Sequence, residues 1–125
     1  MPVVGIGTDI IEINRIVTMA DATRNRLAQR VLTSEEYQFY QQTNHQERYL
    51  AKRWAGKEAA AKALGTGIAD GVSFQHIHIF SLASGQPTLV FSDRALEVAK
   101  TLQASHWHIS LADEKHYATA FVTLS

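Results

Sequence analysis

An alanine-rich stretch, RWAGKEAAAKALGTGI at residues 53–68, constrains the fold more than any other part of this sequence. Alanine and leucine are the strongest helix formers, and Gly65 is well placed to end the helix. The pattern predicts one long helix from about Gln46 to Leu64. A helix of small residues is normally buried, yet this one carries Glu58 and three cations, and buried charges are costly unless they are paired. The stretch alone does not show which groups these charged side chains bind.

Shorter elements are expected on both sides of this helix. The β-branched run at 3–13 predicts a strand buried on both faces, and residues 72–80 and 88–91 predict two further strands. Helical segments are expected at 15–30, 32–42 and 92–103, and a terminal β-hairpin at 106–124. The sequence therefore predicts a mixed α+β organisation around one long helix.

The composition excludes several classes of protein. With 125 residues, of which 46% are hydrophobic, the chain is expected to form a single domain over residues 1–125. It has no cysteine, which excludes disulfides and thiolate metal sites. No apolar run approaches the roughly 20 residues that span a bilayer. We therefore expect a soluble, cytoplasmic protein that does not enter membranes.

The charges are unevenly distributed along the chain. The formal net charge is zero, which argues against a general nucleic-acid binder. Residues 15–62 hold nine Lys/Arg and five Asp/Glu, giving +4, and the remaining residues hold three and seven, giving −4. This pattern is either a mixed surface or a basic face that receives an anionic ligand or partner.

Two carboxylates are candidates for chemistry. Asp9 lies inside the apolar run, where it must be paired, protonated or bound to a metal, unless it sits at an exposed strand end and accepts backbone hydrogen bonds. Glu58 and Lys62 are four residues apart and share one helix face. Taken in isolation they form only a surface ion pair, with Arg53 and Lys57 as two solvated cations.

The histidines offer a competing arrangement. His76 and His78 would share one strand face, as would His106, His108 and Ser110. Two such pairs on adjacent strands could bind a transition metal, as in a metallohydrolase. More often, alternating polar residues mark the solvated side of a half-exposed sheet.

Four segments become informative when they are taken together: GIGTDIIEINRI, RYLAKRWAGKEAAAKALGTGI, SGQP and HISLADEKHYATAFV. In order and spacing, over essentially the whole chain, they resemble the holo-acyl-carrier-protein synthases of bacterial fatty-acid biosynthesis. The resemblance implies an α+β fold with one long central helix packed on a small, mostly antiparallel sheet, assembled as a homotrimer with its sites between protomers. It implies a Mg²⁺-dependent transferase that moves 4′-phosphopantetheine from coenzyme A to a serine of apo-acyl carrier protein and releases adenosine 3′,5′-bisphosphate.

The resemblance also assigns roles to individual residues. Asp9 and Glu58 match the metal ligands, which is chemically sound because Mg²⁺ prefers one or two carboxylates plus phosphate oxygens and water. Lys62 and the backbone around Gly65 match positions beside the pyrophosphate. The general base stays open between Asp9 directly, a metal-bound water held by Asp9 or Glu58, and a neutral Lys62. We favour the carboxylate-held water, because a lysine next to a pyrophosphate should stay protonated.

Other matched positions concern the two substrates. Arg53 and His108 match positions that bind the 3′-phosphate and nucleotide end of coenzyme A, with His108 expected to reach a neighbouring protomer's coenzyme. Four residues match the surface that docks the acidic helix of the carrier protein: Arg15, Met19, Arg24 and Arg26. One departure is Ala112, which stands where many relatives have a histidine.

The sequence is also compatible with two alternatives from other classes. A binding module for coenzyme A or a carrier protein would need Arg53 and Arg15 but not both Asp9 and Glu58. The histidine-centred metallohydrolase is the other alternative. Metal use separates the three: Mg²⁺-dependent turnover indicates the transferase, tightly bound zinc the hydrolase, and no metal the module.

Overall fold

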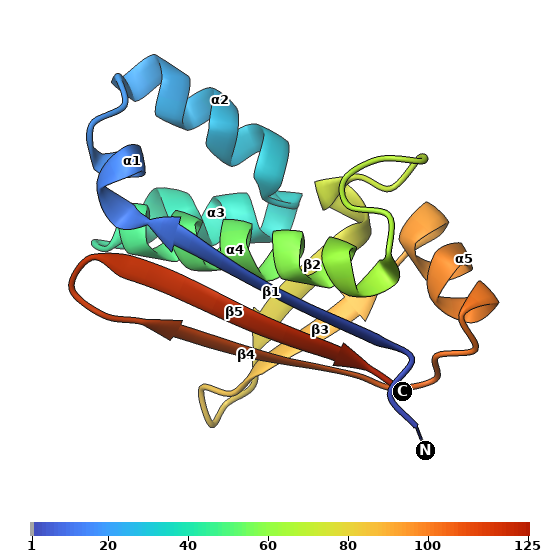
Figure 1. The fold of residues 1–125 in the computed structure, drawn as a ribbon. Helices are drawn as coiled ribbons and strands as arrows, with labels where there is room; N and C mark the ends of the chain where they lie inside the picture. The colour runs from blue at the N-terminus through green and yellow to red at the C-terminus, as the bar shows by residue number, and fades with distance from the viewer. Residues whose placement is uncertain (1) are drawn as a thin grey trace.

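The structure is a computed structural model and describes residues 2–125 (Figure 1). Its elements follow in the order β1 (Gly5–Glu12), α1 (Ile13–Val17), α2 (Asp21–Val31), α3 (Ser34–Gln42), α4 (Gln46–Leu64), a 3₁₀ turn η1 (Phe74–His76), β2 (Ile77–Ser81), β3 (Pro87–Phe91), α5 (Asp93–Thr101), β4 (Trp107–Asp113) and β5 (Tyr117–Leu124). Helices and small antiparallel sheets are both present, so the α+β prediction is confirmed.

The strands form two separate antiparallel sheets. One has the order β1-β5-β4 and the other is the β2-β3 hairpin. Helix α4 packs against β1 and β5, and α2 and α3 contact α4 from the side away from this sheet (Figure 1). The core therefore lies mainly between α4 and one face of the three-stranded sheet.

Strand β1 is covered on one face only. Ile11 is buried, whereas Ile6 is 60% exposed and Ile10 is 59% exposed on the opposite face. The prediction of a strand buried on both faces was therefore wrong, because within residues 2–125 no second layer covers the face away from α4. The predicted strand at 72–80 is also shorter than expected, since residues 74–76 form η1.

Two glycines let α4 approach β1 at backbone distance. A Cβ added to Gly5 would lie 2.2 Å from the carbonyl oxygen of Ala63, and one added to Gly7 would lie 1.9 Å from that of Ala59. Both distances are shorter than any real Cβ contact, so only glycine fits at these positions. The alanines of α4 and the glycines of β1 together form a small-residue crossing, and Asp9 lies immediately beside it.

A buried ion pair connects α4 to the elements around it. Lys57 is fully buried and donates to the carboxylate of Glu36 and to the carbonyl of Val31 at 2.7 Å. Glu36 also completes a capping box with Thr33 at the start of α3. The interpretation of Lys57 as a solvated cation was wrong, because a carboxylate and two carbonyls satisfy its ammonium inside the protein.

Among residues 2–125, none of the helices combines the length and the hydropathy that crossing a lipid bilayer requires.

Candidate active site between helix α4 and strand β1

Lys62 connects α4 to β1 at the small-residue crossing. Its ammonium donates to Asp9 Oδ1 at 3.0 Å and to the carbonyl of Thr8 at 3.0 Å. The sequence pattern placed Lys62 beside Glu58 on one helix face, but its ion-pair partner is Asp9 on the strand. The close approach that Gly7 permits explains this choice, because it brings the edge of β1 within reach of a lysine on α4.

The two carboxylates at the crossing lie close enough to affect each other. Burial, and after it the negative charge of Asp9, raise the pKa of Glu58 above its ordinary value, while Lys62 opposes the shift. Asp9 Oδ2 is buried and has no hydrogen-bond partner among the described residues. A buried, unpartnered carboxylate oxygen near a second carboxylate is an arrangement that a divalent cation would satisfy, and two carboxylates are a donor set that Mg²⁺ accepts.

Ala112 lies at the edge of this site. A groove on the sheet is lined by Thr8, Asp9, Lys62 and Ala112, together with Ser110, Phe121 and their neighbours. Ala112 thus shares a groove with Asp9 and Lys62. A methyl group at this position supplies neither a proton acceptor nor a metal ligand.

Arg53 lies at a second place on α4. Its side chain is almost completely buried and its guanidinium stacks on the ring of Tyr49, with 4.7 Å between the guanidinium carbon and the ring centroid. Arg53 Nε is buried without a hydrogen-bond partner. The residue lines a pocket that also contains Arg48 and Lys52, so positive charge gathers there, with Asp113 as the neighbouring carboxylate.

His108 faces away from α4. In the β4-β5 register it pairs with Thr123, which in turn pairs with Ile6 on the exposed face of the sheet. Because α4 covers the other face, one chain does not bring His108 and Arg53 to the same side of the sheet. If the two residues act on one ligand, they must come from different copies of the chain.

The predicted docking residues lie on α1, on α2 and in the link between them. The guanidinium of Arg15 lies over the ring of Trp54, 5.2 Å from its centroid, and Met19 is half-buried. Arg26 is exposed and donates to the hydroxyl of Thr23 on its own helix at 3.3 Å. Arg24 differs from these residues, because two carboxylates of the same chain already pair with it.

The partners of Arg24 are Asp21 at 2.7 Å and Glu47 at 3.7 Å, and its side chain is only 17% exposed. Glu47 belongs to α4, so Arg24 joins α2 to the start of α4. The sequence could not show this contact, because it depends on how the two helices pack.

The structure does not form the histidine site considered from the sequence. His76 lies in η1, where Nδ1 accepts from the backbone N–H of Ser73 at 3.3 Å, and only His78 is on β2. Strands β2 and β4 belong to different sheets, so the two histidine pairs are not neighbours. Over residues 2–125, no three His, Cys, Asp or Glu side chains gather in a way that could hold a metal ion.

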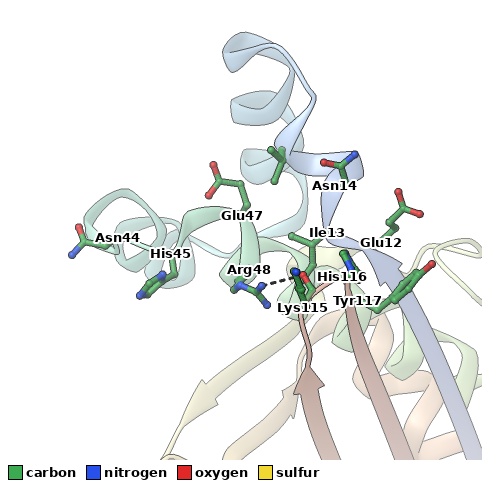
Figure 2. Close-up of a pocket in the computed structure, with 11 residues that line it drawn as sticks. Glu12, Ile13, Asn14, Asn44, His45, Glu47, Arg48, Lys115, His116 and Tyr117 are labelled. Carbon is green, nitrogen blue, oxygen red and sulfur yellow. Dashed lines mark hydrogen bonds between the residues drawn. The ribbon is translucent and has the colours of Figure 1, made fainter.

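Sequence reasoning also missed a pocket at the far end of β1 (Figure 2). There Arg48 donates to Asp113 at 2.8 Å and to the carbonyls of Glu114 and Lys115, and so fixes the β4-β5 loop against α4. Asp9, Glu58 and Lys62 do not line this pocket. Arg48 thus binds three acceptors at the end of β4 and in the loop that follows, a structural role that no local sequence motif indicates.

Comparisons with known proteins identify similar sequences and structures over nearly the whole chain. Residues 5–122 match the 4′-phosphopantetheinyl transferase superfamily. A holo-[acyl-carrier-protein] synthase of Shewanella frigidimarina is 57% identical over 124 residues, which cover 99% of this chain and 98% of the relative. The crystal structure of holo-[acyl-carrier-protein] synthase from Neisseria meningitidis has a TM-score of 0.89 and 38% identity, with 99% of each chain covered.

A further solved structure contains a ligand. It is a holo-(acyl-carrier-protein) synthase from Bacillus anthracis in complex with CoA (3′,5′-ADP). Its TM-score to this chain is 0.79, with 34% identity over 98% of this chain and 96% of that one. The family match spans nearly the whole sequence, and so the chain belongs to the 4′-phosphopantetheinyl transferase superfamily.

Proposed function

We propose that this protein is a holo-acyl-carrier-protein synthase. It transfers 4′-phosphopantetheine from coenzyme A to a serine of apo-acyl carrier protein and releases adenosine 3′,5′-bisphosphate, a step of fatty-acid biosynthesis. The observation that carries the proposal is the crossing of α4 and β1, which gathers Asp9, Glu58 and Lys62 in a member of this transferase family. The cytoplasmic location expected from the sequence is part of the same proposal.

The reaction breaks a phosphoanhydride bond of coenzyme A and forms a phosphodiester on the carrier protein. The serine oxygen attacks the phosphorus that bears the pantetheine arm, and the bond from this phosphorus to the bridging oxygen of the pyrophosphate breaks. The serine proton passes to a base, and the electron pair of the broken bond leaves with the adenosine bisphosphate. Catalysis of such a transfer depends on positioning and on stabilising negative charge at the phosphoryl oxygens.

The residues at the crossing are proposed to have different roles in this transfer. Lys62, which donates from α4 to Asp9, would bind a pyrophosphate oxygen beside the left-handed turn at Gly65 that ends the helix. The Lys62 ammonium already acts as a donor to Asp9 and Thr8, so a carboxylate, directly or through water, is the better acceptor for the serine proton. Asp9 and Glu58 would hold Mg²⁺, which when bound would neutralise the charge of the pyrophosphate.

The 3′-phosphate of coenzyme A is assigned to Arg53. This residue is a nearly buried cation whose Nε lacks a partner, in a pocket that Arg48 and Lys52 also line. A phosphate would supply the acceptor that Arg53 Nε lacks in the chain alone. His108 would reach the nucleotide end of the coenzyme from a second copy of the chain, since it lies on the opposite face of its own sheet.

We further propose that the protein is a homotrimer with its sites between protomers. The sheet face away from α4 exposes large apolar side chains, namely Ile6, Ile10, Tyr117 and Phe121. Apolar groups gathered on one face are typical of a surface that another chain covers. His108 lies on this face, so covering it with a second copy would bring His108 towards that copy. Sedimentation should give a trimer for the wild type and a smaller species for Ile10→Glu, and equal masses would contradict this assembly.

The carrier protein is proposed to dock on α1 and α2. Arg15 and Arg26 are exposed cations and Met19 is a half-buried apolar contact, a combination suited to an acidic amphipathic helix. Arg24 supports this surface through its pairs with Asp21 and Glu47 and faces the partner less directly.

Release of adenosine 3′,5′-bisphosphate tests the reaction. The protein, incubated with coenzyme A, Mg²⁺ and apo-acyl carrier protein, should release the bisphosphate in proportion to carrier protein added. A carrier protein whose acceptor serine is replaced by alanine should give no release. Tight binding of coenzyme A without release would instead identify a binding module.

A further inference from the structure

Two buried cations on α4 have opposite surroundings. Lys57 and Arg53 are four residues apart, so their side chains are neighbours on the helix surface. Lys57 is fully buried and fully satisfied by Glu36 and two carbonyl oxygens. Arg53 is 8% exposed, but its Nε has no partner and its guanidinium forms no ion pair within residues 2–125. The charge of Lys57 is thus neutralised by a carboxylate of the chain, whereas Arg53 has no carboxylate partner within residues 2–125.

Glu36 is the carboxylate that could pair with either cation. It lines the same pocket as Arg53 and Tyr49. Its Oε1 accepts from Lys57 and from the backbone N–H of Thr33, and its Oε2 accepts from the backbone N–H of Ile79 at 2.8 Å. With both oxygens engaged, Glu36 does not turn towards Arg53.

The charge balance shows what Lys57 contributes. Arg53, Lys57 and Glu36 together carry one net positive charge, which a bound anion can neutralise. Without Lys57 the sum is zero, and a 3% exposed carboxylate loses its cation. A buried charge without a partner is strongly destabilising, so Glu36 would then pair with the guanidinium in the same pocket.

We infer that Lys57 is a positioning residue for the anion site: by holding Glu36, it keeps the Arg53 guanidinium free to bind a phosphate group. The inference rests on the proposed function, in which that phosphate is the 3′-phosphate of coenzyme A. The phosphate is bound by Arg53 alone of the two cations, because Lys57 has no exposed surface with which to reach a ligand.

Lys57→Met is the informative change, because it removes the charge and keeps most of the side-chain volume. It should raise KM for coenzyme A about tenfold, which corresponds to the loss of one charge-assisted hydrogen bond. Its kcat should stay within about twofold of the wild type, since Asp9 and Glu58 are proposed to act at the pyrophosphate and not at the 3′-phosphate. KM for dephospho-coenzyme A, which lacks the 3′-phosphate, should stay unchanged.

The double variant Glu36→Gln/Lys57→Met separates this role from a purely structural one. It removes the carboxylate that would capture Arg53, so KM for coenzyme A should return to near the wild-type value. A merely structural role for the buried pair predicts that the double variant is as impaired as Lys57→Met or worse. Lys100→Met, the same substitution at an exposed lysine of α5, is the matched control and should change neither constant.

The outcomes separate this inference from the proposed function. Absence of transfer in the wild type would overturn the proposed function and the inference with it. Equal KM for the two coenzymes in the wild type would leave the transfer reaction standing, but would overturn the assignment of the 3′-phosphate to Arg53 and with it the inference. If Lys57→Met still prefers coenzyme A to dephospho-coenzyme A as strongly as the wild type does, the inference alone is overturned. If Lys57→Met does not fold, the double variant Glu36→Gln/Lys57→Met decides. A preference for coenzyme A over dephospho-coenzyme A as strong as that of the wild type supports the inference, and loss of this preference overturns it.

Discussion

Replacing Gly7 by alanine tests how the crossing of α4 and β1 positions the site. The added Cβ would lie 1.9 Å from Ala59 O and 2.8 Å from Ala63 N, whereas ordinary contacts begin at 3.4 Å. The helix would have to move by about 1.5 Å, the difference between 1.9 and 3.4 Å. Overpacking of this kind typically costs about 1–3 kcal/mol, and the backbone contact places Gly7→Ala at the upper end.

The same displacement should reduce turnover. Lys62 Nζ lies 3.0 Å from Asp9 Oδ1, and an added 1.5 Å exceeds hydrogen-bond distance. A misplacement of about 1 Å can cost about a hundredfold in rate. Urea unfolding would measure the stability of the variant, and transfer kinetics would measure its turnover under conditions where it remains folded.

Gly71→Ala is the matched control for this experiment. Gly71 has φ +88°, so alanine there is strained by about 1–2 kcal/mol, but it lies in the loop after α4 and away from the crossing. It should lose stability and keep its turnover. Normal turnover in Gly7→Ala, or an equal loss of turnover in both variants, would refute the reasoning.

Further predictions concern the two carboxylates, the coenzyme, the carrier protein and pH. Asp9→Ala and Glu58→Ala should each abolish turnover with the fold intact, and near-normal turnover of either at limiting Mg²⁺ would exclude a shared cation. Arg53→Ala should weaken binding of coenzyme A, measured by calorimetry, by about 1.5–3 kcal/mol, with little effect on dephospho-coenzyme A; equal losses would place Arg53 elsewhere. Arg15→Glu should raise KM for the carrier protein and flatten its salt dependence between about 50 and 300 mM, and unchanged kinetics would place the docking surface elsewhere. Burial would raise the pKa of Asp113, but hydrogen bonds from two basic neighbours outweigh this effect and lower the pKa. The ionised Asp113 therefore stabilises the fold above its unfolded-state pKa, and this stabilisation is lost as pH falls through the folded-state pKa. Asp113→Asn should therefore lower the unfolding free energy by about 0.5–1 kcal/mol at pH 7 and by less in acid, and a loss that does not depend on pH would contradict this.

The sequence predicted the elements whose causes are local. Helix α4 has the bounds 46–64 that its alanine content and its terminal glycine indicate, and Gly65 has the left-handed conformation that this end requires. The cap at Thr33 and the hairpin of β4 and β5 were also predictable, because turn residues and alternating side chains determine them within short stretches.

Features that depend on packing could not be predicted in this way. Lys57 is a charged residue on a helix, and its burial follows from the approach of α3, which brings Glu36 to it. The partner of Lys62 depends on a glycine in β1, 55 positions earlier in the chain, and not on its neighbours in α4. The spacing of Asp9 and Glu58 did not itself indicate a site, and the family resemblance supplied that assignment.

Mass spectrometry of the carrier protein tests the central claim most directly. Apo-acyl carrier protein incubated with coenzyme A, Mg²⁺ and this protein should gain the mass of one phosphopantetheine group, located on its acceptor serine by fragmentation. The gain should disappear with Glu58→Ala or when the divalent cation is chelated. An unchanged mass with the wild-type protein, at a coenzyme A concentration shown to saturate binding, would contradict the account.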